Sequence, residues 1–242
     1  MANVKKKLKY FGGYVWEMTK ASLPGIFMYL CAGAIMMMLI LRGKEENNFI
    51  SWTTMNKVWV AVCMVAAAAY NGLICYAHGG SHYEMLVSGN IKRATTDMYG
   101  NEYKISSHKE AKEYRVWKGF VMGAFTAILT LVIGLVFGFR QEKIDGTMTI
   151  STFVCFILSG WSVMPFYAMN QTGTSISYFI TCVFAVVPVV VSGVFYIIGA
   201  YARRRKTIRQ QEIADKAAQA ATQKEKKINY GGLPGTKPKK RK

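Results

Sequence analysis

The sequence has no charge in the places where a soluble helical protein would carry it. Of its 242 residues, 31 are Lys or Arg and 13 are Asp or Glu, yet none of these lies within five long apolar runs. A helix at the surface of a soluble domain keeps a charged, solvated face, so this absence excludes an ordinary soluble helical domain. About 20 uncharged helical residues match the hydrocarbon thickness of a bilayer. The runs are Pro24–Leu41, Val58–Ala77, Gly119–Phe139, Phe153–Met169 and Tyr178–Ala202.

The runs also lack the period-two alternation of polar and apolar residues that is typical of membrane β-strands. We therefore predict an all-α, polytopic membrane protein with a helical bundle over residues 24–202. The run at 153–169 is interrupted in its middle by Ser159, Gly160, Ser162 and Pro165. It is predicted as a fifth membrane-embedded helix that is re-entrant, tilted or spanning. The four full spans are predicted at about 24–41, 58–77, 119–139 and 178–202.

The distribution of Lys and Arg predicts the orientation, because cytoplasmic segments carry an excess of both. If the 153–169 run enters and leaves on one side, the two sides hold 26 and 5 of these residues; if it crosses, they hold 12 and 19. The stronger bias favours four spans. It predicts a multi-pass protein of the cell membrane (plasma membrane) with both termini and the 78–118 loop in the cytoplasm.

The first 23 residues lack a long apolar stretch and instead mix lysines with aromatic residues. This composition is typical of a helix that lies in the membrane interface, so residues 1–23 are predicted to be a basic, aromatic interfacial segment. Gly12 and Gly13 favour two short helical pieces, because glycine lowers helix stability. Pro24 suits the first turn of the next helix.

Histidine is scarce, with three in the whole chain. His78 and His82 are four residues apart, a spacing that a helix would bring to one face, and they are the candidates for a metal site. Zinc needs three or four ligands. The pair Gly79–Gly80 also predicts that the second helix ends between the histidines, with Ser81 capping a new helix. We therefore predict no metal site.

A readable catalytic constellation is also missing. The sequence has no nucleophile beside a base, no paired carboxylates at membrane depth and no glycine-rich phosphate loop. No catalytic or cofactor-binding residue and no cofactor is predicted, and the sequence favours a protein that is not an enzyme. The five cysteines all lie within the apolar runs. We expect them to behave there as small apolar residues without disulfides.

Polar and small residues within the runs predict how the helices pack. We expect side-chain hydrogen bonds between helices from Asn71, Thr126, Thr130, Thr181 and Ser192. The third run also contains two pairs of glycines spaced four residues apart, a pattern that allows close helix packing. These glycines are Gly119, Gly123, Gly134 and Gly138. They pack either within the bundle or against another chain.

Acidic residues are rare after residue 202, where three of them accompany fourteen Lys or Arg. The first part of this segment is rich in helix-forming residues, and its Gly- and Pro-containing end favours disorder. Residues 203–242 are therefore predicted to be a basic cytoplasmic tail, helical and then disordered. Basic residues near a membrane attract anionic lipid or a polyanion such as RNA. The predicted contact residues are Arg203, Arg204, Arg205, Lys206, Lys239, Lys240 and Arg241.

These features favour an accessory or scaffold subunit of a membrane. Its predicted partners are anionic headgroups at the cytoplasmic face, proteins that the sequence does not identify, and a ribosome or RNA reached by the tail. The alternative is a small transporter or channel for a neutral polar solute, built around the interrupted run. A water-lined cavity at Asn71, Ser159 or Ser162 would favour this alternative, whereas a closed bundle with dry glycine contacts would favour the scaffold.

Overall fold

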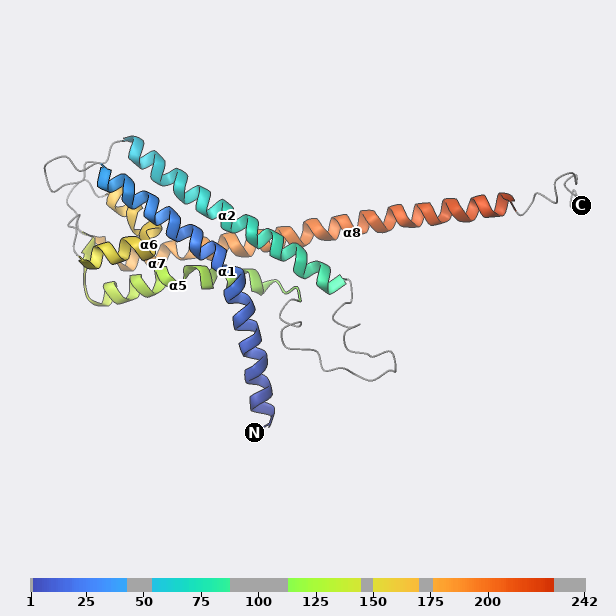
Figure 1. Cartoon of the computed structure of the whole chain (residues 1–242), viewed down its shortest axis with the longest axis horizontal. Coiled ribbons are helices and arrows are strands. Elements are labelled where there is room, and N and C mark those ends of the chain that lie inside the picture. Colours follow the sequence, from blue (N-terminus) through green and yellow to red (C-terminus); the bar gives the residue numbers. More distant parts are fainter. Residues whose placement is uncertain (1, 43–53, 88–112, 145–149, 170–175, 229–242) are drawn as a thin grey trace, which may run out of the picture. The chain divides into compact units, whose positions relative to one another are not determined.

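A computed structural model describes residues 2–42, 54–87, 113–144, 150–169 and 176–228. These residues are helical apart from two short strands and the turns beside them (Figure 1). The chain divides into two units, Met1–Ala200 and Tyr201–Lys242. The elements are α1 (Ala2–Arg42), α2 (Thr54–Val87), α5 (Trp117–Phe139), β1 (Lys143–Ile144), α6 (Ile150–Met169), β2 (Ile176–Ser177), α7 (Phe179–Phe184) and α8 (Val186–Ile228).

Four helical stretches are long and apolar enough to cross a membrane, and this confirms the predicted all-α membrane fold. They are Phe11–Met38, Lys57–Val87, Trp117–Phe139 and Phe179–Thr222. A shorter apolar helix, Phe153–Phe166, lies within α6 and corresponds to the predicted fifth membrane-embedded helix.

The buried side chains of the first unit form three clusters, which we call layers. The Ile144 layer consists of Met36, Val60, Ile133, Ile144, Cys155, Phe156, Val163, Met164, Phe166 and Tyr178. The Tyr29 layer consists of Tyr29, Ala32, Ala67 and Trp161. The Met18 layer consists of Met18, Ala21, Cys75, Met122 and Tyr196. Each layer draws on several helices, so the order in which a helix meets the layers gives its direction.

The long helices alternate in direction through these layers. Helix α1 runs from the Met18 layer through the Tyr29 layer to the Ile144 layer, and α2 runs the opposite way. Helix α5 runs in the same direction as α1, and α7 with the first part of α8 returns to the Met18 layer. At the Met18 end, α1 therefore enters the bundle and the first unit ends at Ala200.

Helix α6 follows a different path from the others. Its first and last buried side chains, Cys155 and Phe166, both belong to the Ile144 layer, whereas Trp161 between them reaches the Tyr29 layer. The backbone at Ser159 is not helical (φ −139°, ψ 23°), and Figure 1 shows two short helical pieces that meet at an angle. Helix α6 thus enters the bundle from the Ile144 end and returns to that end.

The strands β1 and β2 lie before and after α6 in the chain and pair with each other. They form an antiparallel pair in which Ile144 lies opposite Ile176 and Lys143 lies opposite Ser177. The segments that precede and follow α6 in the chain therefore lie next to each other.

Two local sequence predictions were wrong. Helix α2 continues through Gly79–Gly80 to Val87. The predicted 78–118 loop therefore begins as helix, and Ser81 lies inside α2 and does not cap a new helix. Residues 88–112 lie outside the described part. A side chain at Gly79 would overlap the carbonyl of Tyr196 on α8, so tertiary packing outweighs the low helix propensity of glycine. Helix α1 likewise continues through Gly12, Gly13 and Pro24.

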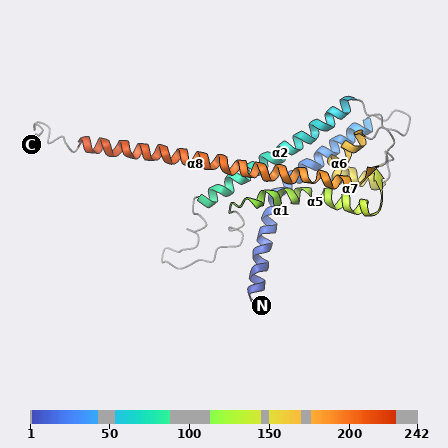
Figure 2. The same cartoon turned by 180° about the vertical axis from the view of Figure 1, so that it is seen from behind.

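Pro24 lies inside α1 rather than at its start. An internal proline removes the hydrogen bond to the carbonyl four residues earlier and is a common cause of helix kinks. Figures 1 and 2 both show that α1 changes direction along its length. One bent helix therefore replaces the predicted short pieces.

The second unit, taken by itself, is the helical stretch from Tyr201 to Ile228 at the end of α8. Its described side chains are exposed from Arg204 to Thr222, apart from half-buried Thr207. The predicted disordered end, residues 229–242, lies outside the described residues.

Candidate functional site

The interruption of α6 is closed by its own side chains. The Ser162 hydroxyl donates to the Ser159 carbonyl at 2.9 Å, and the two hydroxyl oxygens lie 2.6 Å apart. Because the Ser162 proton is used on the carbonyl, the Ser159 hydroxyl is the donor between the two oxygens. Both side chains are fully buried. Non-helical backbone at membrane depth is tolerated where protein buries it, and the break meets this condition.

A pair of glycines lets α1 cover this break. A side chain built on Gly33 would lie 3.2 Å from the backbone of Gly160, and one built on Gly160 would lie 2.9 Å from Gly33. The two backbones are therefore in direct contact beside Trp161. This packing leaves the broken segment no room for solvent between α1 and α6.

One polar pair joins α2 to α8 inside the bundle. The amide nitrogen of Asn71 donates to the Ser192 hydroxyl at 2.9 Å, and both residues are buried. The Asn71 carboxamide also packs against Gly25 of α1, where a side chain would overlap its oxygen. The prediction of interhelical hydrogen bonds thus holds for this pair.

The threonines behave differently from that prediction. The Thr126 hydroxyl donates to the Met122 carbonyl at 3.0 Å and the Thr181 hydroxyl to the Tyr178 carbonyl at 2.8 Å, each within its own segment. A threonine can satisfy its hydroxyl in this way without a partner helix. For these two residues the expected interhelical bonds were wrong.

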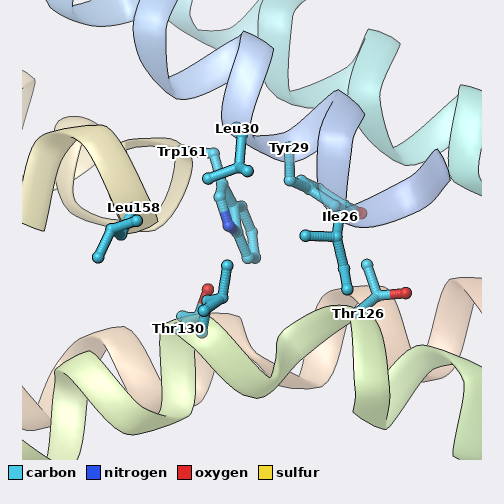
Figure 3. A pocket seen from close by; sticks show the side chains of 8 residues that line it. Ile26, Tyr29, Leu30, Thr126, Thr130, Leu158 and Trp161 are labelled. Carbon is cyan, nitrogen blue, oxygen red and sulfur yellow. The ribbon is translucent and has the colours of Figure 1, made fainter. Parts of the chain in front are cut away.

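A pocket lies between α1, α5 and α6 (Figure 3). About 180 Å³ of space not filled by atoms lies there, part of it open to the outside, but no part is wide enough for a water molecule. Tyr29 is 3% exposed. Its hydroxyl is close enough to Asn71 for an electrostatic interaction, but it forms no well-aligned hydrogen bond with any described residue. The pocket is therefore too narrow to hold a water molecule. Its lining includes Ile26, Tyr29, Leu30, Thr126, Thr130, Leu158 and Trp161.

A group of polar and aromatic side chains adjoins the Met18 layer and shares Tyr196 with it. We call it the His82 cluster, and it comprises Tyr14, His82, Tyr114, Lys118 and Tyr196. The His82 ring nitrogen Nδ1 and the Tyr196 hydroxyl lie 2.9 Å apart, and Tyr114 stacks on Tyr196 at 5.4 Å with an interplanar angle of 10°. The cluster ties together the ends of α1, α2, α5 and the bundle part of α8.

Lys118 supplies the buried cation of the His82 cluster. Its side chain is completely buried, donates a hydrogen bond to the Glu113 carbonyl and lies 5.1 Å from the centre of the Tyr14 ring. Carbonyl oxygens and ring faces both stabilise an ammonium group. The arrangement positions a charge firmly, but the described residues around it form no nucleophile–base pair.

The two candidate metal ligands share a helix face after all. Because α2 continues through Gly79–Gly80, the rings of His78 and His82 lie 5.9 Å apart. Within the described residues, no group of three or more His, Cys, Asp or Glu could hold a metal ion. His82 instead bonds Tyr196. The five cysteines are free thiols.

The glycines of α5 lie against α7 and α8. A side chain on Gly119 would come within 2.6 Å of Tyr196, and one on Gly123 within 2.5 Å of the Pro188 carbonyl. Near the other end, side chains on Gly134 and Gly138 would come within 2.6 Å of Cys182 and 2.8 Å of Phe179. In this structure, the two glycine pairs are occupied by the chain's own helices.

The predicted contact residues of the tail are only partly described. Arg204, Arg205 and Lys206 are exposed on α8, and Arg203 is half-buried. Lys239, Lys240 and Arg241 lie outside the described residues.

Sequence reasoning missed Lys118 and Tyr196 as structural centres. Lys118 looked like the last charge before an apolar run, and Tyr196 looked like one aromatic among many. The available signal was their position beside glycines. Lys118 precedes Gly119 and Tyr196 follows Gly193, and at these two glycines α5 and α8 come close together.

Comparisons with protein-family models, with curated proteins and with solved structures found no match for the chain.

Proposed function

We propose that the chain is a multi-pass protein of the cell membrane that serves as an accessory or scaffold subunit and engages an anionic partner through its basic tail. The observation that carries this proposal is a helix whose side chains from Arg204 to Thr222 are exposed, apart from half-buried Thr207. A helix without tertiary packing is marginal in water. We therefore expect this helix to be stabilised by binding to another molecule.

The packing of the bundle supports a scaffold rather than a transporter. Ser159, Ser162 and Asn71 use their polar groups on each other or on Ser192. The pocket beside them is too narrow for water. A pathway for a polar solute needs groups that water or solute can reach, and these groups are closed off.

The path of α6 supports the predicted orientation. The strands that precede and follow α6 in the chain pair with each other at Ile144 and Ile176, as a re-entrant segment would require. With four crossings, both termini and the 78–118 loop face one side, and that side holds 26 of the 31 Lys and Arg residues. The positive-inside rule assigns it to the cytoplasm.

The charge of the tail defines the chemistry of the partner. Residues 203–209 contain five basic residues and no acidic residue. This cluster follows directly after the last apolar segment, where anionic headgroups and anionic partners held near the membrane are within reach. Binding through such a cluster weakens as salt increases.

Cross-linking and affinity purification from native membranes test the proposal. Full-length protein is compared with a chain stopped at Ala202 and with a variant in which Arg203, Arg204, Arg205 and Lys206 are changed to Gln. We expect one protein complex, or ribosomes, to be enriched with the full-length chain and lost from both altered chains. The matched control changes Lys216, Lys224, Lys226 and Lys227 to Gln and should retain the partner.

Each other outcome has a definite meaning. The same partner with and without the tail would refute tail-directed binding and move the interface to the bundle or the 78–118 loop. No specific partner in any sample would refute the scaffold proposal, and solute uptake in reconstituted vesicles would then be the next measurement.

A further inference from the structure

We infer that the first part of α1, residues 2–16, is a second lipid-binding element, which lies on the membrane surface and binds anionic headgroups. This inference does not depend on the function proposed for the tail. It rests on the position of Tyr14 at the boundary between hydrocarbon and headgroups, on the exposure of the apolar residues before it and on the charge of the lysines there.

Aromatic residues mark the level at which α1 leaves the bundle. The Tyr14 ring lies 6.3 Å from the Trp117 ring and 5.1 Å from the Lys118 ammonium. Trp and Tyr with a neighbouring Lys are typical of the boundary between hydrocarbon and headgroups. Residues that precede Tyr14 therefore begin at the headgroup level.

The length of α1 leads to the same placement. Its apolar stretch, Phe11–Met38, has 28 residues and would be about 42 Å long at the helical rise of 1.5 Å per residue. The hydrocarbon core is only about 30 Å thick. The stretch is consequently longer than the core is thick, and the contacts of Tyr14 with Trp117 and Lys118 assign the excess to its start. The bend of α1 (Figure 2) provides a change of direction.

Apolar side chains in this segment are uncovered by the described protein. Leu8 is 71% exposed, Phe11 67% and Trp16 57%. A side chain built on Gly12 would meet no atom of the described chain within 4 Å beyond its own helix. Apolar groups of this size on a helix at the headgroup level are suited to insertion between lipids.

Charge selects the kind of lipid. Lys5, Lys6, Lys7 and Lys9 precede or flank these apolar residues, and no acidic residue occurs before Glu17. Each Lys near an anionic surface adds to binding, and the contributions accumulate. Apolar insertion combined with several lysines is the pattern of an interfacial helix that prefers anionic membranes.

Hydrogen–deuterium exchange of the full-length protein in nanodiscs tests the inference. The protein is placed in phosphatidylcholine alone and in phosphatidylcholine mixed with phosphatidylglycerol. We expect the amides of residues 4–16 to exchange about tenfold more slowly in the anionic membrane, because binding protects the helix from opening. Amides of α2 should exchange equally in both membranes and so report an intact bundle.

Two variants identify the charges that act. Changing Lys5, Lys6, Lys7 and Lys9 to Gln should remove the difference between the two membranes. The matched control, with Lys216, Lys224, Lys226 and Lys227 changed to Gln, should keep it. Equal exchange of residues 4–16 in the two membranes, or a difference that survives the first variant, would overturn the inference.

Discussion

Ile144 and Ile176 face each other in the antiparallel pair of β1 and β2, although the whole of α6 lies between them in the sequence. Ile144 is also 1% exposed and packs in the same layer as Cys155 and Phe166, near the two ends of α6. The pairing forces the chain to return to the place from which it left. Both parts of α6 therefore pack at the end of the bundle that the Ile144 layer marks.

This relationship predicts the sidedness of the two connecting segments. Cysteines introduced by Arg140→Cys and Ser177→Cys should react with a membrane-impermeant maleimide from the same side of sealed vesicles. A cysteine introduced by Lys216→Cys should react only from the other side. Labelling of Arg140→Cys and Ser177→Cys from opposite sides would show that α6 crosses the membrane. The unaltered chain provides the background, because its cysteines lie within apolar segments.

Close glycine packing predicts a second result. Gly123→Leu places a side chain against the backbone of Pro188 and Val189, which cannot move aside. We expect a loss of about 1–3 kcal/mol in the free energy of unfolding, as for other overpacked sites. The measurement is unfolding in mixed micelles.

Gly12→Leu is the matched control, since the space around Gly12 is open. It should leave the free energy of unfolding unchanged or raise it slightly, because leucine favours helix more than glycine does. Equal destabilisation by both substitutions would mean that helix propensity, not packing, sets the cost at Gly123.

The Asn71–Ser192 hydrogen bond predicts a measurable coupling. A double-mutant cycle with Asn71→Ala and Ser192→Ala should give an interaction energy of about 0.5–2 kcal/mol, the usual range for hydrogen bonds within membranes. Thr126→Val is the comparison, because the Thr126 hydroxyl bonds only its own helix and its loss should not couple to Asn71→Ala. A coupling near zero for Asn71 and Ser192 would contradict the bond.

The His82 cluster predicts that one hydroxyl stabilises the end of the bundle. Tyr196→Phe removes the hydrogen bond to His82 while leaving the ring stacked on Tyr114. We expect the free energy of unfolding to fall by about 1 kcal/mol, the net value of a typical buried hydrogen bond. Thermal unfolding in detergent measures it. Tyr201→Phe changes an exposed tyrosine and should have no effect; an equal loss in both variants would argue against the bond.

Much of the fold could be read from the sequence because membrane insertion depends on composition over a long window. The four helices that are long and apolar enough to cross a membrane, and the shorter apolar helix, follow from uncharged runs, since a charge at the centre of a bilayer is costly. The interruption at Ser159 also had a local signal in its polar and glycine neighbours. These properties depend on one segment and the bilayer, without reference to the other helices.

The failures came where another helix determined the outcome. Gly79–Gly80 reads as a helix end, yet α2 continues because the backbone of α8 packs against Gly79. Lys118 directly precedes an apolar run in the sequence, and nothing in that position predicts that it is fully buried against Tyr14 and Glu113. No local pattern contains the position of a partner on a distant helix.

By itself, the sequence determined that this is an all-α membrane protein with a strongly basic tail, because hydrophobic run length and charge act residue by residue against lipid and water. Only the tertiary structure decided that both parts of α6 pack in the Ile144 layer and that the glycines of α5 pack against α7 and α8. It also decided that Asn71 bonds Ser192 on another helix, whereas Thr126 bonds a carbonyl of its own helix. These outcomes depend on which surfaces lie within a few ångströms of each other. That distance is set by the packing of all the helices together.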